Sequence, residues 1–385
     1  MREAAVGVEG ICQDRFAAVK ALFEQNFASG DDVGASVALI IDDEVVIDLW
    51  GGTATFDGGI EKPWERDTII NVWSTTKTMA ALSALVLADR GEIDVDAPVA
   101  RYWPEFAANG KQGVLVRHLL SHSAGLAGWQ EPMMPDDLYD WEKCTSMLAA
   151  QAPWWEAGTQ SGYHAITQGY LVGEVVRRAS GATVGSFFAD EIAGPLGADF
   201  FIGTPATADA RVAHVIAPQG GITDPNATAD SIAVRTMRYP KLDASASSTI
   251  PWRRAEIPAA GGHGNARSVA TVQSIVSHAG QANGVRLLSE AGVARIFDEQ
   301  TYGQDLVLPG VFRLGVGYGL NCPELPISPN PRTCFWGGWG GSLVVNDLDA
   351  RMTFAYVMNR MGEGTTGDMR AGGLLMTAYA ALAAG

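Results

Sequence analysis

Ser74 and Lys77 are the two residues of this chain whose types and spacing suggest joint chemistry. They stand three positions apart at the start of a long apolar helical pattern, and side chains at that spacing share one helix face. A serine hydroxyl needs a base before it attacks a carbonyl carbon, and a partly desolvated lysine amine can be that base. The chain has only six lysines, and Lys77 alone has a serine three positions before it. The pair therefore predicts a covalent intermediate on Ser74, in hydrolysis or in acyl transfer.

The position of Ser74 at the predicted helix start gives a second reason to expect catalysis. The first turn of a helix has free backbone N–H groups and the positive end of the helix dipole, which suit a developing oxyanion. The alternative is a plain N-cap serine with a solvated lysine, because short motifs also match by chance.

Two aromatic, glycine-rich parts of the chain supply candidate partners. Tyr163 is followed by His164 and Ala165, and a tyrosine near a lysine ammonium can be held as phenolate or can relay a proton. The segment 335–342, with the sequence FWGGWGGS, precedes a strand pattern, and its glycines would let a backbone edge approach a substrate closely. The alternatives are an ordinary core tyrosine and a flexible hairpin turn.

Length, charge and cysteine content limit the class of protein. The 385 residues can build a large core, and a net charge of −16 argues against nucleic acid and anionic membranes as partners. The start of the chain has no signal-peptide pattern, and no stretch is long enough to cross a bilayer, which favours a cytoplasmic protein. The cysteines have no metal-like spacing and are expected to be incidental or buried thiols: Cys12, Cys144, Cys322 and Cys334.

The expected elements place strands near both ends of the chain and helices in the middle. Helical patterns cover 14–29, 74–90, 171–178, 268–279 and 369–382. Strand patterns cover 37–41 and 45–50, closed by Gly51-Gly52, and later 315–320, 342–346 and 352–358, with a turn at 347–350. These patterns predict a mixed α+β fold, in which an antiparallel sheet flanked by helices carries an inserted helical lobe. The region 218–251 has few periods and is expected to be a long loop region over a cleft.

The candidate residues and further segments together resemble the serine β-lactamase and penicillin-binding protein superfamily. The chain looks most like its class C-related esterase branch, the family VIII carboxylesterases. The resemblance covers nearly the whole chain and rests, besides the three segments above, on 46–52, 103–106, 116–126, 173–175 and 261–267.

The resemblance implies roles for these residues. Ser74 would be the nucleophile, Lys77 its general base or proton partner, and Tyr163 a second proton carrier. The backbone N–H groups of Ser74 and Trp339 would form an oxyanion hole, and the cleft edge would be Trp336, Gly337 and Gly338. The chain would be one catalytic unit, with an α/β lobe from about 1–70 and 270–385 and a mainly helical lobe at about 71–269.

Two departures from the family pattern favour ester hydrolysis. Ala165 stands where the superfamily has the asparagine of Tyr-x-Asn, and Trp336 stands where it has the lysine of Lys-Thr-Gly. A β-lactam carries an amide and a carboxylate that those polar residues would hold. Their loss predicts a carboxylesterase for neutral, apolar, short-chain esters, and the tryptophan would be a flat hydrophobic wall.

Other histidines and tryptophans give weaker signals. His118 and His122 have the spacing of a zinc helix without its glutamate, and no Gly-x-Ser-x-Gly elbow occurs, so structural histidines are favoured over a metal site. His164 could line the cleft. Three tryptophans could form an acyl or alcohol pocket or could simply pack in the core: Trp129, Trp154 and Trp155.

Several activities remain open on the same residues. They are β-lactam hydrolysis, D-amino-acid peptide cleavage, amide-oligomer hydrolysis and acyl transfer. A penicillin-binding sensor that never turns over, or a relative with a dead site, would use the fold differently. Which of Lys77 and Tyr163 is the base stays undecided here. The expected partner is a small-molecule ester, with no metal and no cofactor needed, and the oligomeric state is unknown.

Overall fold

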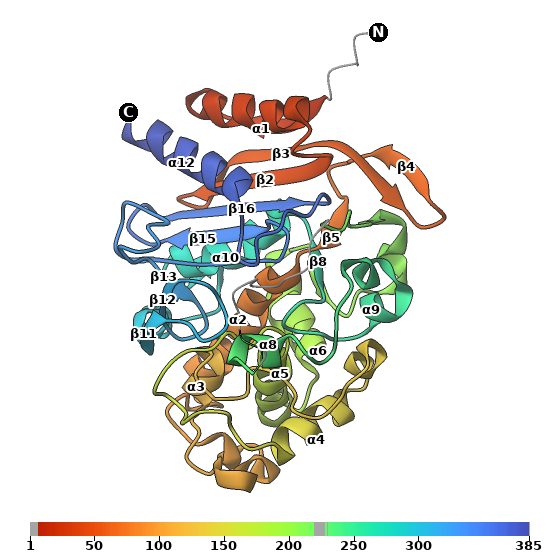
Figure 1. The fold of residues 1–385 in the computed structure, drawn as a ribbon. Coiled ribbons are helices and arrows are strands. Elements are labelled where there is room, and N and C mark those ends of the chain that lie inside the picture. Colours follow the sequence, from red (N-terminus) through yellow and green to blue (C-terminus); the bar gives the residue numbers. More distant parts are fainter. Residues whose placement is uncertain (1–6, 219–227, 229, 385) are drawn as a thin grey trace.

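The computed structural model describes residues 7–218, 228 and 230–384. Its largest element is an antiparallel sheet built from both ends of the chain (Figure 1). The strand order is β1-β3-β2-β16-β15-β14-β13-β12-β11, with β4 paired to β3. The strands are β1 Val8–Cys12, β2 Gly34–Ile41, β3 Glu44–Phe56, β4 Ile60–Pro63, β11 Thr301–Gln304, β12 Val311–Leu314, β13 Gly319–Leu320, β14 Thr333–Gly337, β15 Leu343–Asp347 and β16 Met352–Met358.

The pairing of β2 with β16 joins the two ends of the chain. Ala35 pairs with Met358 and Ile41 with Met352, and every residue of β16 is buried. A continuous apolar strand of this kind belongs at the centre of a sheet that is covered on both faces. The mixed α+β class and its antiparallel sheet, both predicted from the sequence, are confirmed.

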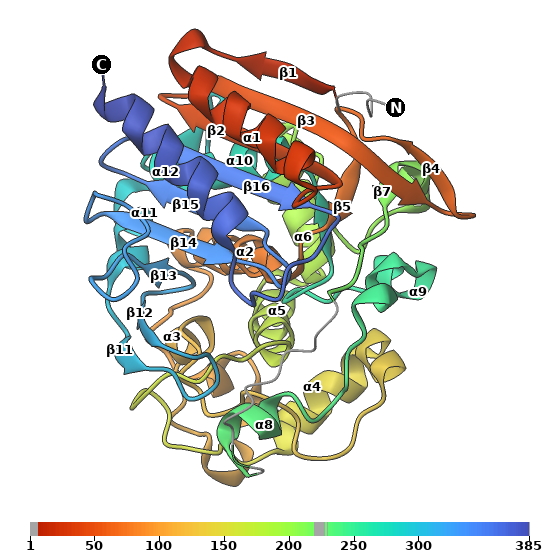
Figure 2. The same ribbon diagram turned by 45° about the horizontal axis from the view of Figure 1, so that its top comes forward.

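Helices cover both faces of this sheet. On one face α1 (Ala17–Ser29) lies beside α12 (Met369–Ala383), as Figure 2 shows. On the other face α10 (Ala266–Ser277) packs against β2, β15 and β16. Beyond α10 lies α2 (Thr76–Asp89), which packs against α5 (Thr167–Ser180) among the other helices of the middle region.

The remaining elements are short. The helices are α3 Val116–Leu120, α4 Trp141–Ala150, α6 Val184–Phe188, α7 Gly194–Leu196, α8 Ile232–Thr236, α9 Ile250–Arg254 and α11 Glu290–Ala294. The small strands are β5 Ile69–Asn71, β6 Phe201–Ile202, β7 Val212–Ala213, β8 Gly262–Gly264, β9 Gln281–Ala282 and β10 Val285–Arg286. The strands β6-β8-β5-β7 form a second sheet, whose strand β5 shortly precedes α2 in the chain.

Helix α2 runs through the interior, and Thr76 to Leu87 are all buried. Its Ala, Leu and Met residues favour helix, and a helix that is apolar all round must be surrounded by protein. A buried helix with no exposed face holds its start in one place, which matters because Lys77 lies in the first turn of α2 and Ser74 in the short 3-10 turn Trp73–Thr75 directly before it.

Two predicted strand boundaries are wrong. The strand predicted to end at Gly51-Gly52 continues to Phe56, and its last residues, Thr53 to Phe56, pair with β4. Gly52, with a φ of 87°, bends the strand without ending it. The predicted strand 315–320 is a strand only at Gly319–Leu320, because the chain turns at Gly317 with a φ of 89°. A glycine permits these left-handed conformations inside a strand pattern, and periodicity does not reveal them.

The region 218–251 is only partly a loop. It contains the short helix α8 and the first residues of α9, whereas 219–227 and 229 lie outside the described residues.

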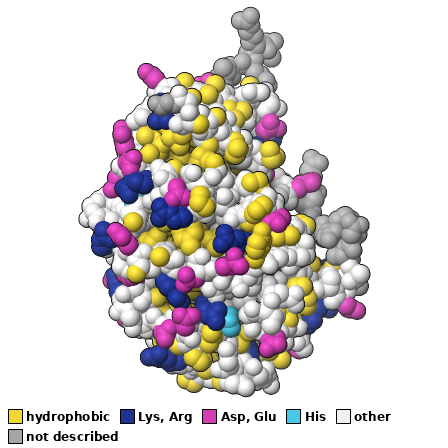
Figure 3. All heavy atoms as spheres, turned by 90° about the vertical axis from the view of Figure 1, so that its left-hand side faces the viewer, with side chains coloured by type: hydrophobic (Ala, Val, Ile, Leu, Met, Phe, Trp, Pro, Cys, Tyr) yellow, Lys and Arg dark blue, Asp and Glu magenta, His cyan; other side chains and the backbone are white. Residues whose placement is uncertain are grey.

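All four cysteines are free thiols. On the face drawn in Figure 3, acidic and basic side chains are interspersed. No described helix combines the length and hydropathy that a bilayer crossing needs.

Candidate active site

The nucleophile candidate lies in a strained turn. Ser74 follows Trp73, whose φ of 48° is left-handed although the residue is not glycine. The Trp73 backbone N–H donates to Oδ1 of Asn71 at 3.3 Å, and its ring packs against Trp252 and Trp339 at 5.4 and 4.9 Å between centroids. Such a conformation costs on the order of 1–3 kcal/mol and persists only when the surroundings hold it. The strain marks this turn as a candidate functional site.

The side chains of Ser74, Lys77 and Tyr163 form a triangle. Lys77 Nζ lies 3.0 Å from Ser74 Oγ and 2.9 Å from Tyr163 Oη. The Tyr163 hydroxyl donates to Ser74 Oγ at 2.5 Å. All three distances are within hydrogen-bond reach, so a proton can pass between any two of these groups.

Lys77 is almost completely buried, and its amine is surrounded by neutral groups. Nζ donates to the backbone carbonyl oxygens of Ala165 and Ala259 at 2.7 and 2.9 Å. No ion pair joins Lys77 to a carboxylate of the described chain. Burial therefore lowers the pKa of Lys77 well below its ordinary value, because nothing negative compensates the lost hydration of the ammonium.

Tyr163 comes from the loop before α5, and a carboxylate holds its backbone. Oδ1 of Asp305 accepts from the N–H groups of Tyr163, Val307 and Leu308 at 3.0, 2.8 and 2.8 Å. Burial raises the pKa of Tyr163, while the hydrogen bond to Ser74 opposes that rise, so the phenol is neutral. Asp305 carries no motif that the sequence would reveal, and it becomes relevant only because β11 and β12 bring its loop to Tyr163.

The turn after β14 lies against Ser74. A Cβ on Gly338 would clash with Ser342 Oγ and Val72 O and would lie 3.2 Å from the backbone nitrogen of Ser74. The backbone N–H groups of Ser74 and Trp339 have no hydrogen-bond acceptor among the described residues. Two free N–H groups beside a nucleophile suit the negative oxygen of a tetrahedral intermediate.

A largely apolar pocket of about 400 Å³ opens onto Ser74. Its lining residues come from the start of α2, the loops around 127 and 165, the segment from α8 to Leu242, and the turn at Trp339. They are Trp73, Ser74, Ala127, Gly128, Trp129, Tyr163, Ala165, Ile166, Thr167, Thr236, Met237, Tyr239, Pro240, Lys241, Leu242, Ala260, Trp339 and Thr365. The segment 236–242 belongs to the region 218–251, which the sequence predicts to lie over a cleft, but no catalytic residue type marks its individual residues as pocket lining.

The expected cleft edge lies on or next to β14. Trp336, Gly337 and Gly338 are not among the lining residues of this pocket, although Gly338 lies against the backbone of Ser74. The Trp336 side chain is buried behind Tyr163 and stacks on His122 with ring centroids 5.2 Å apart. The reason is that side chains alternate between the two faces of the sheet along β14. The Trp336 side chain points to the face where it packs in a small apolar cluster with Leu308, Phe312 and Leu314.

The structure also separates the four expected pocket residues. Trp129 lines the pocket, whereas His164, Trp154 and Trp155 do not. His164 is buried and structural: Nδ1 bonds the carbonyl oxygen of Gly162 at 2.6 Å, Nε2 accepts from a backbone N–H at 3.0 Å, and burial lowers its pKa to about 3. The Trp154 ring lies under the Arg235 guanidinium at 4.1 Å from the centroid, and Trp155 donates to a loop carbonyl.

The part of the chain that the structure covers contains no cluster of side chains that could bind a metal ion. No three His, Cys, Asp or Glu side chains come together there as possible ligands. His118 and His122, whose spacing resembles that of a zinc helix, are separate because α3 ends at Leu120 and His122 has a φ of 57°.

Comparison with known proteins places this geometry in a family. The Beta-lactamase family model matches residues 19–377. The chain belongs to the beta-lactamase family. Its relatives in that family include the esterase/beta-lactamase LipL of Mycobacterium tuberculosis, which is 35% identical over 367 residues, covering 92% of this chain and 83% of LipL.

Solved structures of the beta-lactamase family resemble the fold closely. A family VIII carboxylesterase is 42% identical with a TM-score of 0.91, covering 97% of this chain and 100% of that chain. EstA of Arthrobacter nitroguajacolicus Rue61a is 27% identical with a TM-score of 0.86, covering 97% of this chain and 98% of that chain. A penicillin-binding protein homologue of Caulobacter crescentus is 39% identical with a TM-score of 0.88, covering 97% and 100%. The resemblance inferred from the sequence is confirmed, and the chain is a serine hydrolase of this family.

Proposed function

We propose that this protein is a carboxylesterase that hydrolyses neutral, short-chain esters through an acyl-enzyme on Ser74. The observation that carries the proposal is the environment of Lys77. Its two bonds to backbone carbonyls occupy both N–H groups of a neutral amine. The remaining lone pair can then accept the proton of Ser74 Oγ, 3.0 Å away. Burial lowers the pKa of Lys77 well below its ordinary value and so favours this neutral state, and Lys77 is therefore our choice as the base.

Acylation uses all three side chains. As Ser74 Oγ attacks the ester carbonyl carbon, its proton passes to Lys77 Nζ, and the N–H groups of Ser74 and Trp339 hold the oxyanion. The C–O bond to the alcohol then breaks. Tyr163 gives its phenolic proton to the departing alkoxide and is reprotonated by Lys77 at 2.9 Å. The products of this half-reaction are the free alcohol and the acyl ester of Ser74.

Deacylation repeats the sequence with water as the nucleophile. Tyr163 passes its proton to Lys77 while it accepts one from the attacking water. The acyl–Oγ bond breaks, and Lys77 returns the proton to Ser74 Oγ at 3.0 Å. The carboxylic acid leaves, and the three groups regain their starting protonation states.

The lining of the pocket supports esters over β-lactams. Ala165 lines the pocket where the superfamily pattern has an asparagine, and Lys241, an exposed residue, is the single charged residue among the described lining residues. Among the described lining residues no side-chain amide is present, and the one cation is exposed, whereas an apolar acyl or alcohol group would bury well. Chain-length preference and the cytoplasmic location stay predictions.

One rate comparison tests the proposal. We expect p-nitrophenyl butyrate to be hydrolysed with a kcat/KM at least about tenfold above that of a chromogenic cephalosporin, and Ser74→Ala to abolish ester turnover with its fold intact. A fluorophosphonate should add its mass to the peptide containing Ser74. Faster cephalosporin turnover would favour the β-lactamase alternative, and full activity in Ser74→Ala would refute the mechanism.

A further inference from the structure

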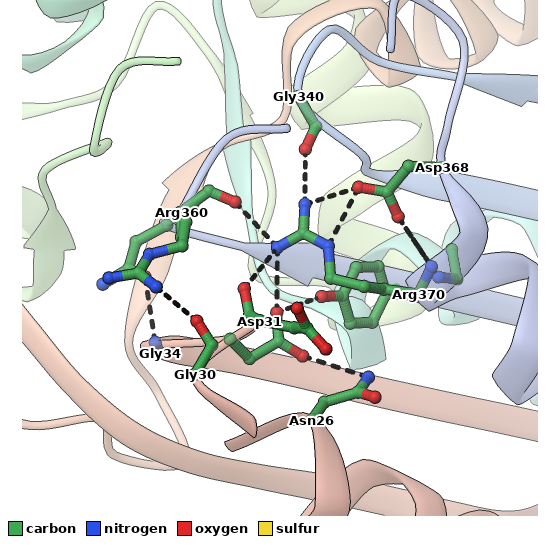
Figure 4. Close-up of polar contacts among 12 residues, drawn as sticks. Asn26, Gly30, Asp31, Gly34, Gly340, Arg360, Asp368 and Arg370 are labelled. Carbon is green, nitrogen blue, oxygen red and sulfur yellow. Dashed lines mark hydrogen bonds and ion pairs between the residues drawn. The ribbon is translucent and has the colours of Figure 1, made fainter. Parts of the chain in front are cut away.

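The turn that carries Trp339 is held by one arginine of helix α12. Arg370 lies in the first turn of α12, and only 12% of its side chain is exposed. Figure 4 shows its guanidinium at the centre of a polar cluster, with Gly340 on one side and the segment of Gly30 and Asp31 on the other. Nη2 donates to the carbonyl oxygen of Gly340 at 2.7 Å.

The remaining bonds of Arg370 anchor the guanidinium itself. Nε and Nη2 donate to Oδ2 of Asp368 at 2.9 and 2.5 Å, and Nη1 donates to Oδ1 of Asp32 at 3.0 Å. Nη1 also donates to the carbonyl oxygens of Asp31 and Arg360 at 3.1 and 2.9 Å. A planar fork bonded at every nitrogen has little freedom to move, so its contact to Gly340 is a fixed one.

Asp32 anchors the arginine in the protein interior. Its side chain is fully buried, and the hydroxyl of Tyr356 on β16 and the Asn26 amide both donate to it, at 2.5 and 3.3 Å. The Asp32 to Arg370 pair therefore links the central strand β16 and the end of α1 to the turn at Gly340. The sheet and the turn cannot shift relative to each other without breaking either the hydrogen bond from Arg370 to Gly340 or the buried ion pair between Arg370 and Asp32.

The turn from Gly338 to Gly341 is held at both ends. Gly340 receives a second hydrogen bond at its carbonyl from the Gly362 N–H at 2.7 Å, and its own N–H donates to Gly364 O at 2.8 Å. At the other end, Gly338 O accepts from Gly367 N at 3.4 Å and, within the turn, from Gly341 N at 3.2 Å. That carbonyl shares a peptide plane with the N–H of Trp339, so the direction of the Trp339 N–H follows from the position of the turn.

We infer that Arg370 is a positioning residue that holds the Trp339 N–H in place for the oxyanion. The inference rests on the proposed function, because it requires an oxyanion at Ser74. Arg370 touches neither substrate nor reacting atoms; it acts through Gly340. A misplaced donor weakens the stabilisation of the transition state more than the binding of the ester, whose carbonyl carries less negative charge.

The experiment compares Arg370→Lys with Arg360→Lys. Lysine keeps a positive charge beside Asp32, but a single ammonium cannot reproduce the fork that reaches Gly340. Arg360 is the matched control: it is exposed, belongs to the same cluster, and its guanidinium donates to Gly30 O and not to the turn. Active sites are counted with a fluorophosphonate, so that a misfolded fraction does not enter kcat.

Removing a whole oxyanion donor costs about 100- to 1,000-fold in kcat, and a displaced donor should lose a part of that. We expect Arg370→Lys to lower kcat per titrated site about tenfold with KM within about twofold, and to weaken an alkylboronic acid inhibitor by a similar factor. Arg360→Lys should stay within about twofold in all three. Unchanged kcat per titrated site in Arg370→Lys, or an equal loss in both variants, would overturn the inference.

Two outcomes separate this inference from the proposed function. If the wild-type protein hydrolyses no ester, or Ser74→Ala remains active, the proposed function fails. If the wild-type protein is active, Ser74→Ala is inactive and Arg370→Lys equals the wild type per titrated site, the proposed function stands and the role of Arg370 fails. A variant that yields too few titratable sites is replaced by Asp368→Asn, which loosens the same guanidinium while leaving the Asp32 pair intact.

Discussion

Oδ1 of Asp305 accepts a hydrogen bond from the backbone N–H of Tyr163 at 3.0 Å, across a sequence separation of 142 residues. The same oxygen also closes the loop that follows β11. One buried carboxylate thus joins the outer strands of the sheet to the proton relay beside Ser74. The relationship leads to the first prediction.

Asp305→Asn should preserve much of the activity, whereas Asp305→Ala should not. Asparagine keeps an Oδ1 acceptor for the three N–H groups, but alanine leaves buried donors unsatisfied, at about 1–3 kcal/mol each. We expect Asp305→Ala to lose several kcal/mol in urea unfolding and about tenfold in kcat. Equal effects of the two substitutions on kcat would show that the hydrogen bonds do not position Tyr163.

Lys77 should give the activity an acidic limb. A neutral amine is needed to accept the Ser74 proton, so kcat/KM should rise as pH increases through the depressed pKa of Lys77 and then level off. Lys77→Arg cannot become neutral and should lose at least about 100-fold at every pH. Steady-state rates across the pH range at which the fold is intact would test this, and a profile that falls with increasing pH would contradict it.

Lys77 should also make stability depend on pH. Its pKa in the folded state is below the unfolded value of about 10.4, so between these two values the unfolded chain binds one more proton. In that window the free energy of unfolding should rise with pH by up to about 1.4 kcal/mol per unit. The difference between wild type and Lys77→Met, measured by urea unfolding at several pH values, isolates this contribution. A difference that is constant with pH would mean that Lys77 stays protonated when folded.

Gly338→Ala should inactivate the enzyme. The added Cβ would clash with Ser342 Oγ and Val72 O and crowd the Ser74 backbone nitrogen, which belongs to the proposed oxyanion hole. We expect a loss of at least about 100-fold in kcat, in the range seen when an oxyanion donor is removed.

The matched control for that variant is Gly372→Ala in α12. A Cβ on Gly372 has nothing within 4 Å. Alanine there should leave kcat unchanged and stabilise the helix by about 0.5–1 kcal/mol, because glycine is a poor helix former. Normal turnover by Gly338→Ala would show that the turn tolerates displacement and would argue against the placing of the oxyanion hole.

Ala165→Asn should shift the substrate preference. Residue 165 lines the pocket, so an amide there would face the substrate and would replace apolar lining by a donor and an acceptor. We expect the ratio of kcat/KM for p-nitrophenyl butyrate over a chromogenic cephalosporin to fall about tenfold, mainly through slower ester turnover. An unchanged ratio would show that residue 165 does not determine the choice between esters and β-lactams.

Helix α10 and strand β16 show why most of the fold could be predicted. Their apolar patterns have the periods of a helix and of a buried strand, and the structure places them at Ala266–Ser277 and Met352–Met358. Strand β1 and strand β14 escaped prediction. The first is a short edge strand with mostly exposed side chains, and the second is rich in glycine and tryptophan at its end. Neither has the periodicity that a strand prediction needs.

The sequence by itself determined which groups are proposed to react. Ser74 and Lys77 are three positions apart on one helix, so local geometry alone brings them together. Tyr163 and the segment 335–342 could be proposed as partners through their residue types and their likeness to a known family. Local geometry does not, however, say how such distant segments meet.

Only the tertiary structure decided the surroundings of these groups. Burial of Lys77 among backbone carbonyls, the orientation of Trp336 away from the pocket, and the hold of Asp305 on Tyr163 all depend on which distant segments pack together. The pKa of a lysine and the direction of a side chain on a strand follow from neighbours across the fold. Those neighbours are set by the packing of the whole sheet and its helices, and no short stretch of sequence contains them.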